Sequence, residues 1–192
     1  MNKPTALLIA APLIALAGCS TSTVTKTTTA PPSSTAVTSA AAPASSTQDN
    51  LTGPIGTTYT VTTQDNSGND VSYEVTATRI LDPAQGADEI TTPDKGKRFV
   101  GVQFKITGKT GYSTDDANNN ASINGTDQQV YQADFSTISA GTNFNSGNFS
   151  VTAGRTQTGW VTFQLPHGVK VDTVQWQAGF GNSQPATWTA GL

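Results

Sequence analysis

Apolar and polar residues alternate along most of the chain from residue 53 onward. A period of two is typical of β-strands with one buried face, because successive side chains of a strand point to opposite sides. No segment of useful length has the spacing of an amphipathic helix. The alternation predicts strong strands at 58–63, 71–81, 96–108, 154–166 and 169–179, and weaker strands at 121–124, 128–133 and 142–150.

The same alternation predicts which side chains face the core. Polar residues between the apolar ones, such as Glu74, Gln103 and Lys105, are expected on the opposite face. The apolar phase slips between Val171 and Val174, which predicts a β-bulge or a bend there. The predicted core residues are Tyr59, Val61, Val71, Tyr73, Val75, Ala77, Val100, Val102, Phe104, Ile106, Val161, Phe163 and Leu165.

Seven to nine short strands with turns rich in Gly, Asn and Pro predict an all-β sandwich for residues 53–192. The chain has a single cysteine, so apolar packing alone is expected to hold the sandwich together. Each buried Val, Ile or Phe contributes about 1.5–3 kcal/mol before the entropy of ordering is subtracted. Phe104 and Phe163 are therefore the first positions at which a truncation is expected to destabilise the fold.

The N-terminus has a different pattern. Lys3 precedes a run of apolar or small residues from Ala6 to Ala17, which is shorter than the roughly 20 residues of a bilayer-spanning helix. Such a segment is typical of a signal peptide, here residues 1–18. Leu16-Ala17-Gly18-Cys19 resembles the lipobox of bacterial lipoproteins, which implies cleavage between Gly18 and Cys19. The alternative is an ordinary signal peptide with an incidental cysteine.

The lipobox resemblance implies a covalent diacylglycerol and an N-acyl lipid such as palmitate on Cys19, and no other cofactor. Two or more acyl chains anchor a protein stably, so the expected location is the extracytoplasmic face of the cell membrane. Residues 19–52 follow as a lipidated linker. Residues 20–48 are Ser, Thr, Ala and Pro except for Val24, Lys26, Val37 and Gln48. This composition predicts a disordered stalk, with or without O-glycosylation, because it buries too little apolar surface to offset its ordering entropy.

The charge of the chain excludes one class of partner. The formal net charge is −3 at pH 7, and the Lys and Arg residues are scattered along the sequence. A protein that neutralises phosphates needs a basic patch, so nucleic-acid binding is not expected.

Three segments resemble a known family: GKRFVGVQFKITG (96–108), INGTDQQVYQ (123–132) and VTAGRTQTGWVTFQLPHG (151–168). They are similar to secreted immunoglobulin-like domains of unknown function, which occur in lipoproteins of Gram-positive bacteria, mycobacteria included, and are akin to a small secreted mycobacterial immunogenic antigen. The resemblance covers about residues 53–180. Gly108 and the Asn-rich stretch 115–120 depart from it. It implies an immunoglobulin-like β-sandwich that serves as an interaction module without enzymatic chemistry.

Few residues suggest chemistry. His167, the one histidine, has no nucleophile near it in sequence, so we interpret it as a turn residue rather than a catalytic base. Asp116, Asn118, Asn120 and Asp127 have spacings found in Ca²⁺-binding loops, which makes them a weak candidate for a Ca²⁺ site. Two features count against it: the sixth position is not glycine, and the bidentate Glu is missing. A solvated polar loop is the favoured interpretation.

The tryptophans offer a second candidate site. Trp160 lies on the strand face opposite Val161 and Phe163, so the alternation allows it to point outward, where aromatic residues serve as contact anchors. Trp160 and Trp176 are therefore a candidate interaction surface. The alternative is that these side chains cover a second sheet face or the C-terminal tail.

These observations favour a non-enzymatic, membrane-anchored lipoprotein of the cell envelope. Its domain is expected to bind an envelope protein or a wall component, in addition to the membrane contact made by the lipid. Two alternatives remain: an envelope carrier of a small ligand or Ca²⁺, and an inhibitor or accessory subunit of a secreted enzyme.

Overall fold

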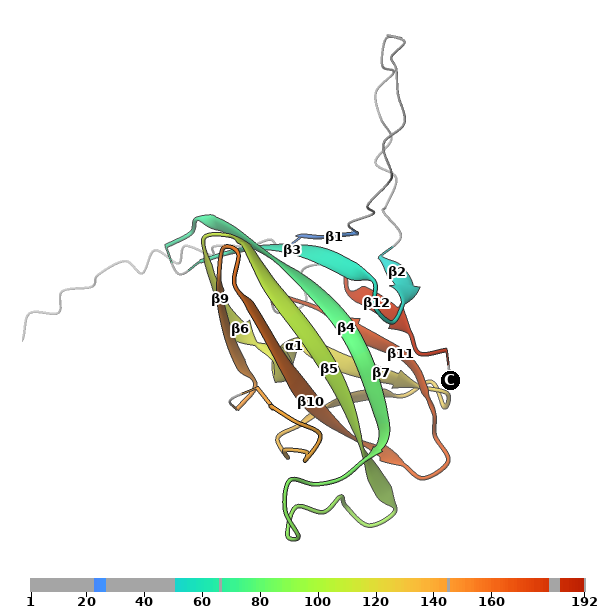
Figure 1. Cartoon of the computed structure of the whole chain (residues 1–192). Helices are drawn as coiled ribbons and strands as arrows, with labels where there is room; N and C mark the ends of the chain where they lie inside the picture. Colours follow the sequence, from blue (N-terminus) through green and yellow to red (C-terminus); the bar gives the residue numbers. More distant parts are fainter. Residues whose placement is uncertain (1–22, 27–50, 66, 145, 180–183, 192) are drawn as a thin grey trace, which may run out of the picture.

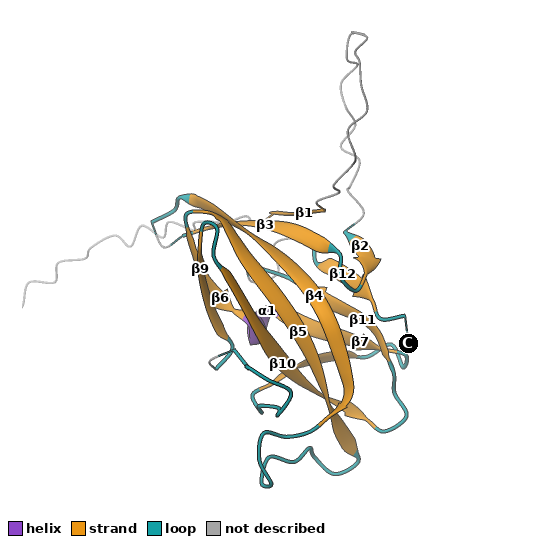
Figure 2. Ribbon diagram, in the orientation of Figure 1, coloured by secondary structure: helices purple, strands orange, loops and turns teal. Residues whose placement is uncertain are grey.

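The computed structural model describes residues 23–26, 51–65, 67–144, 146–179 and 184–191. The predicted signal peptide, with Gly18, and the predicted acylation site, Cys19, lie outside the described residues. The described part is almost entirely β-structure, with one helical turn that the alternation does not predict (Figure 2). Within it, no helix is long and apolar enough to cross a membrane.

Ten strands form one continuous sheet, and two more pair beside it (Figure 1). The order in the large sheet is β1-β3-β4-β5-β10-β8-β7-β11-β12-β2, and the small sheet is β6-β9. The elements are β1 (Thr23–Lys26), β2 (Thr52–Pro54), β3 (Thr58–Gln64), β4 (Asp70–Ala84), β5 (Lys97–Thr110), β6 (Tyr112–Asp116), α1 (Ala117–Asn120), β7 (Ala121–Gly125), β8 (Val130–Asp134), β9 (Asn148–Thr152), β10 (Thr156–Pro166), β11 (Val171–Trp176) and β12 (Ala186–Thr189).

The large sheet curls so that its two halves pack face to face. The halves join where β10 pairs with β8 through Thr162–Asp134 and Phe163–Ala133. Phe104 on β5 then meets Trp176 on β11 and Trp188 on β12, with ring centroids 5.0 and 6.0 Å apart. The prediction of an all-β sandwich is confirmed.

Two buried tyrosines add polar links between the halves. The Tyr59 hydroxyl donates to the Thr187 carbonyl at 3.0 Å, and the Tyr73 hydroxyl accepts from Trp176 Nε1 at 3.2 Å. Burial raises the pKa of Tyr59 to about 12. It also raises the pKa of Tyr73, with a further contribution from the charge of Asp115. Both phenols therefore stay protonated at neutral pH, and their hydrogen bonds persist.

The predicted inward faces are confirmed. All thirteen side chains assigned to the core are at most 3% exposed. The register of β11 shifts between Val171 and Thr173, which places the irregularity in the predicted segment. Gln103 is half-buried and Lys105 is exposed, as expected for the outer face. Period-two alternation was sufficient for these residues because β4, β5 and β10 each contact the main core with one face only, although Phe99 and Trp160 are buried in a second apolar cluster on the other face.

Three predictions about elements need correction. The weak strand expected at 142–150 is a loop followed by β9, which begins at Asn148. Strands β6 and β12 are not predicted, because β6 contains mostly polar residues and β12 is short. The linker expected to be disordered contains β1, which pairs antiparallel with β3 and buries Val24. Residues 27–50 of the linker lie outside the described part.

Candidate functional site

Two loops at one end of the sandwich expose large apolar side chains. The loops are residues 85–96, between β4 and β5, and residues 135–143, after β8; together we call them the tip (Figure 1, lower part). Ile90 is 89% exposed and Phe135 is 77% exposed. Of the described residues, they are the two most exposed large hydrophobic side chains. An apolar side chain held in water is a natural contact point for another molecule.

Backbone hydrogen bonds join the two loops of the tip. The amide of Ala87 donates to the Thr137 carbonyl, and the amide of Ser139 donates to the Gln85 carbonyl, both at 3.0 Å. Between them, Gly86 forms a β-bridge with Ile138. A Cβ at Gly86 would lie 1.9 Å from the Thr91 carbonyl oxygen, so the first loop folds back closely on itself at a residue that must be glycine.

Two aspartates fix the turns that carry the apolar residues. Asp88 Oδ1 accepts from the amides of Ile90 (3.2 Å) and Thr91 (2.8 Å) and from the Thr91 hydroxyl (2.6 Å). Asp134 Oδ1 accepts from the Ser136 amide at 2.8 Å, next to Phe135. The hydrogen bonds from Thr91 lower the pKa of Asp88. These turns are therefore formed at neutral pH, when the carboxylates are charged.

Gln164 on β10 connects the two loops from beneath. Its Nε2 donates to Asp134 Oδ2 and its Oε1 accepts from the Asp94 amide, both at 2.7 Å. Partial burial opposes ionisation of Asp134, but the hydrogen bonds from Ser136 and Gln164 outweigh it and lower the pKa of this carboxyl. One amide side chain thus orients both halves of the tip.

Trp160 supports the tip from inside. Its side chain is 3% exposed and packs in a separate apolar cluster with Ala84, Phe99 and Ile138. Arg79 covers the ring, with the guanidinium carbon 5.4 Å from the ring centroid. Gly101 makes room for this packing, because a Cβ there would lie 2.4 Å from Ile138 Cδ1.

The prediction that Trp160 and Trp176 form an interaction surface is wrong. Trp176 is fully buried between the sheet halves, and Trp160 is covered by the 135–143 loop, which pairs with β10 through the Asn143–Trp160 bridge. The alternative, that these rings cover a sheet face, describes Trp160. The side chains that reach solvent are Ile90 and Phe135. Each is a single large apolar residue within a polar, turn-forming stretch, and this sequence signal is too common to identify a site by itself.

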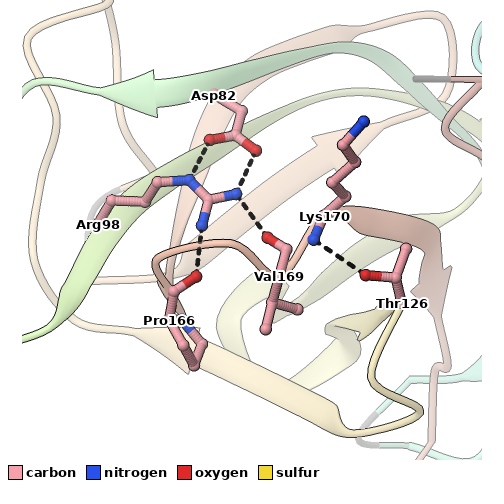
Figure 3. Close-up of polar contacts among 6 residues, drawn as sticks. All are labelled: Asp82, Arg98, Thr126, Pro166, Val169 and Lys170. Carbon is pink, nitrogen blue, oxygen red and sulfur yellow. Dashed lines mark hydrogen bonds and ion pairs between the residues drawn. The ribbon is translucent and has the colours of Figure 1, made fainter.

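Arg98 locks the strand ends beneath the tip (Figure 3). Its Nε and Nη2 donate to the two carboxylate oxygens of Asp82 at 2.6 and 2.7 Å. Nη1 donates to the Pro166 carbonyl at 2.6 Å, and Nη2 also donates to the Val169 carbonyl at 2.7 Å. The hydrogen bonds and the charge of Asp82 raise the pKa of Arg98 above its usual value. These contacts satisfy the planar fork of the guanidinium, so we assign Arg98 a structural role.

The sequence comparison assigns this all-β domain to a family. Residues 62–186 match the family described as "Domain of unknown function (DUF4352)". The chain belongs to the DUF4352 family. No curated protein and no solved structure matches the chain. The matched residues run from the last part of β3 to the first residue of β12, so the DUF4352 domain includes both loops of the tip.

The candidate Ca²⁺ loop of this DUF4352 domain is not assembled. The Asp116 carboxylate caps α1, where it accepts from the amides of Asn118 (2.8 Å) and Asn119 (3.4 Å). Asn120 is buried and donates to Asp115 at 2.7 Å. Asp127 lies beyond the other end of β7, where it accepts from the Tyr131 hydroxyl at 2.7 Å. The four predicted ligands therefore do not converge, and no described group of three or more His, Cys, Asp or Glu does so.

His167 of the DUF4352 domain lies in the turn between β10 and β11, where it was expected. Its backbone amide donates to the Gly96 carbonyl at 3.0 Å, and its side chain is exposed. In the same region the amide of Lys170 donates to the Thr126 hydroxyl at 3.1 Å (Figure 3). The backbone role of His167 is thus to join the β10–β11 turn to the 85–96 loop.

Proposed function

We propose that this DUF4352 protein is a non-enzymatic lipoprotein, anchored to the cell membrane through Cys19, that binds an envelope protein with its tip. The carrying observation is that Ile90 and Phe135 are exposed on two loops whose backbones are hydrogen-bonded to each other. Fixing the loops before binding reduces the entropy lost on association. The resemblance of residues 16–19 to a lipobox supports the proposed anchoring of the protein to the cell membrane.

The charges of the tip indicate what kind of surface it fits. Asp88, Glu89 and Asp94 lie on either side of Ile90 along the first loop, and the neighbouring cations in the sequence are Lys95 and, at the start of β5, Lys97. Lys97 is already paired with Asp94 at 2.9 Å. The partner is therefore a protein with an apolar pocket bordered by cationic side chains, since complementary charge guides association and suppresses wrong partners.

Photocrosslinking from the tip tests this binding role. We expect p-benzoylphenylalanine in place of Phe135 to capture one protein on irradiated cells. The same analogue in place of Tyr112, which is 54% exposed near the opposite end, serves as the matched control and should not capture it. Adding Ile90→Ser should lower the yield at position 135 about tenfold, the effect of losing about 1.4 kcal/mol of binding. Equal adducts from both positions, or adducts with wall polysaccharide instead of protein, would contradict the proposal.

The anchor is tested separately by Cys19→Ser. We expect this variant to lose all labelling by a fatty-acid probe, because the thiol that accepts the diacylglycerol is gone, and to remain unprocessed or enter the medium. Ser20→Ala, the adjacent substitution, should be labelled like the wild type. Gel fluorescence after click coupling measures both. Continued labelling of the Cys19→Ser protein would show that the lipid is elsewhere or that no lipobox operates.

A further inference from the structure

A short strand from the N-terminal region, β1, pairs with the edge of β3 that β4 leaves uncovered. β1 pairs antiparallel with β3 in the register Thr23–Thr62, Val24–Val61, Thr25–Thr60 and Lys26–Tyr59. Val24 is 5% exposed and belongs to the main apolar core, while the other three β1 side chains are exposed. This is the pattern of strand addition, in which backbone hydrogen bonds and a buried alternate side chain hold an extended segment on a sheet edge.

The chain is held again on the domain directly after residue 50. The amide of Thr187 donates to the Leu51 carbonyl at 2.7 Å, and β2 pairs in parallel with β12. Residues 27–50 therefore connect two points on the same domain. They do not lie between Cys19 and the domain while β1 is paired. Only residues 20–22 then separate Cys19 from the first paired residue, Thr23.

We propose that β1 is a clamp that holds the domain within a few residues of the lipid anchor. This inference rests on the proposed acylation of Cys19. With β1 paired, four Cα steps allow the acylated residue to lie at most about 14 Å from the domain. With β1 detached, the whole segment 20–51 becomes the tether and could extend to about 110 Å. The pairing therefore decides whether the segment acts as a short link or as a stalk.

The direction of β1 also orients the domain. Thr23, the first residue of β1, pairs with Thr62 near the end of β3, so the N-terminal end of β1 points toward the turn that joins β3 to β4. β4 runs from that turn, at Asp70, to the beginning of the tip, after Ala84. The clamp thus places the 65–69 turn near the membrane and directs the tip away from it, toward a partner in the envelope.

Disulfide trapping tests the pairing without any lipid. In a full chain with Cys19→Ser, Thr23→Cys and Thr62→Cys are opposite in register and should form an intramolecular disulfide on mild oxidation. Thr23→Cys with Thr58→Cys is the out-of-register control, and we expect its yield to be about tenfold lower because its Cα atoms are too far apart. Equal yields in the two variants, failure of both, or a disulfide-linked dimer would overturn the clamp within one chain.

Energy transfer to a membrane dye tests whether the paired β1 holds the β3–β4 turn closer to the membrane than the tip. Cysteines introduced at Ser67 or Glu89 of the acylated full chain are labelled with a donor, and the protein is placed in phosphatidylcholine vesicles with a headgroup acceptor. Transfer should be several-fold greater from position 67 than from position 89. Val24→Asp should abolish the difference, because it places a charge in the core, and Thr23→Asp on the exposed face should not.

The outcomes separate the two proposals. Equal transfer from positions 67 and 89 in the wild-type background, or a difference that survives Val24→Asp, would overturn the clamp. A chain that carries no lipid would overturn the proposed anchoring, and the disulfide yields would then decide whether β1 is paired.

Discussion

Replacing Phe104 with alanine is expected to lower the free energy of unfolding by about 3–5 kcal/mol. Phe104 is fully buried where the two halves of the sheet meet, and its ring contacts those of Trp176 and Trp188. Truncation removes the transfer free energy of the ring and leaves a cavity between two large indoles that cannot both move into it. Urea denaturation followed by tryptophan fluorescence measures the loss.

Phe135→Ala is the matched control, because the same atoms are removed from a ring that is 77% exposed. Its free energy of unfolding should stay within about 0.5 kcal/mol of the wild-type value. A loss below about 1 kcal/mol for Phe104→Ala would mean that the two sheet halves do not pack through this ring. A large loss for Phe135→Ala would mean that Phe135 is part of the folded core rather than a contact point for a partner.

The sequence predicted most of the core because each long strand carries its own signal. In β4, β5 and β10 one face contacts the main core, and the burial of that face follows the period-two alternation directly. Part of the other face is also covered, at Phe99 and Trp160. The irregularity predicted between Val171 and Val174 follows from the same alternation. An extra residue in a strand moves the side chains that follow it to the opposite face, so the apolar positions change from odd to even numbers or the reverse.

Trp160 could not be placed by this reasoning. Alternation assigns it correctly to the face of β10 opposite Val161, but it does not show whether that face is covered. The cover comes from the 135–143 loop, which pairs with β10 through Asn143 and packs Ile138 against the indole. Contacts between segments that are far apart in sequence, and that lack a repeating pattern, leave no local signal.

The tip and β1 were missed for related reasons. Ile90 and Phe135 are single apolar residues in polar loops, and exposed apolar residues of this kind are common enough to attract no interpretation alone. What distinguishes them is the hydrogen-bonded arrangement of their loops, which only the structure shows. In β1, composition favoured disorder, yet the alternating Thr-Val-Thr segment needs only one buried side chain to add to the edge of β3.

Replacing Arg98 with methionine is expected to lower the free energy of unfolding by about 3 kcal/mol, the lower end of the effect of breaking a buried ion pair. The side chains of Arg98 and Asp82 are only 17% and 16% exposed, so little water could reach the Asp82 oxygens to replace the two lost hydrogen bonds. The carbonyls of Pro166 and Val169 would also lose their donor. Chemical denaturation at pH 7 measures the change.

A double-mutant cycle with Asp82→Asn separates the ion pair from the carbonyl contacts. Asp82→Asn alone should destabilise less than Arg98→Met, because Arg98 keeps both carbonyl acceptors and one amide oxygen. The double variant should be more stable than the sum of the two single effects predicts, since no unpaired carboxylate remains. Lys97→Met is the control for loss of a neighbouring cation: its pair with Asp94 is exposed, so the change should be under about 1 kcal/mol. Strictly additive effects, or equal losses for Lys97→Met and Arg98→Met, would mean that Arg98 does not lock the strand ends beneath the tip.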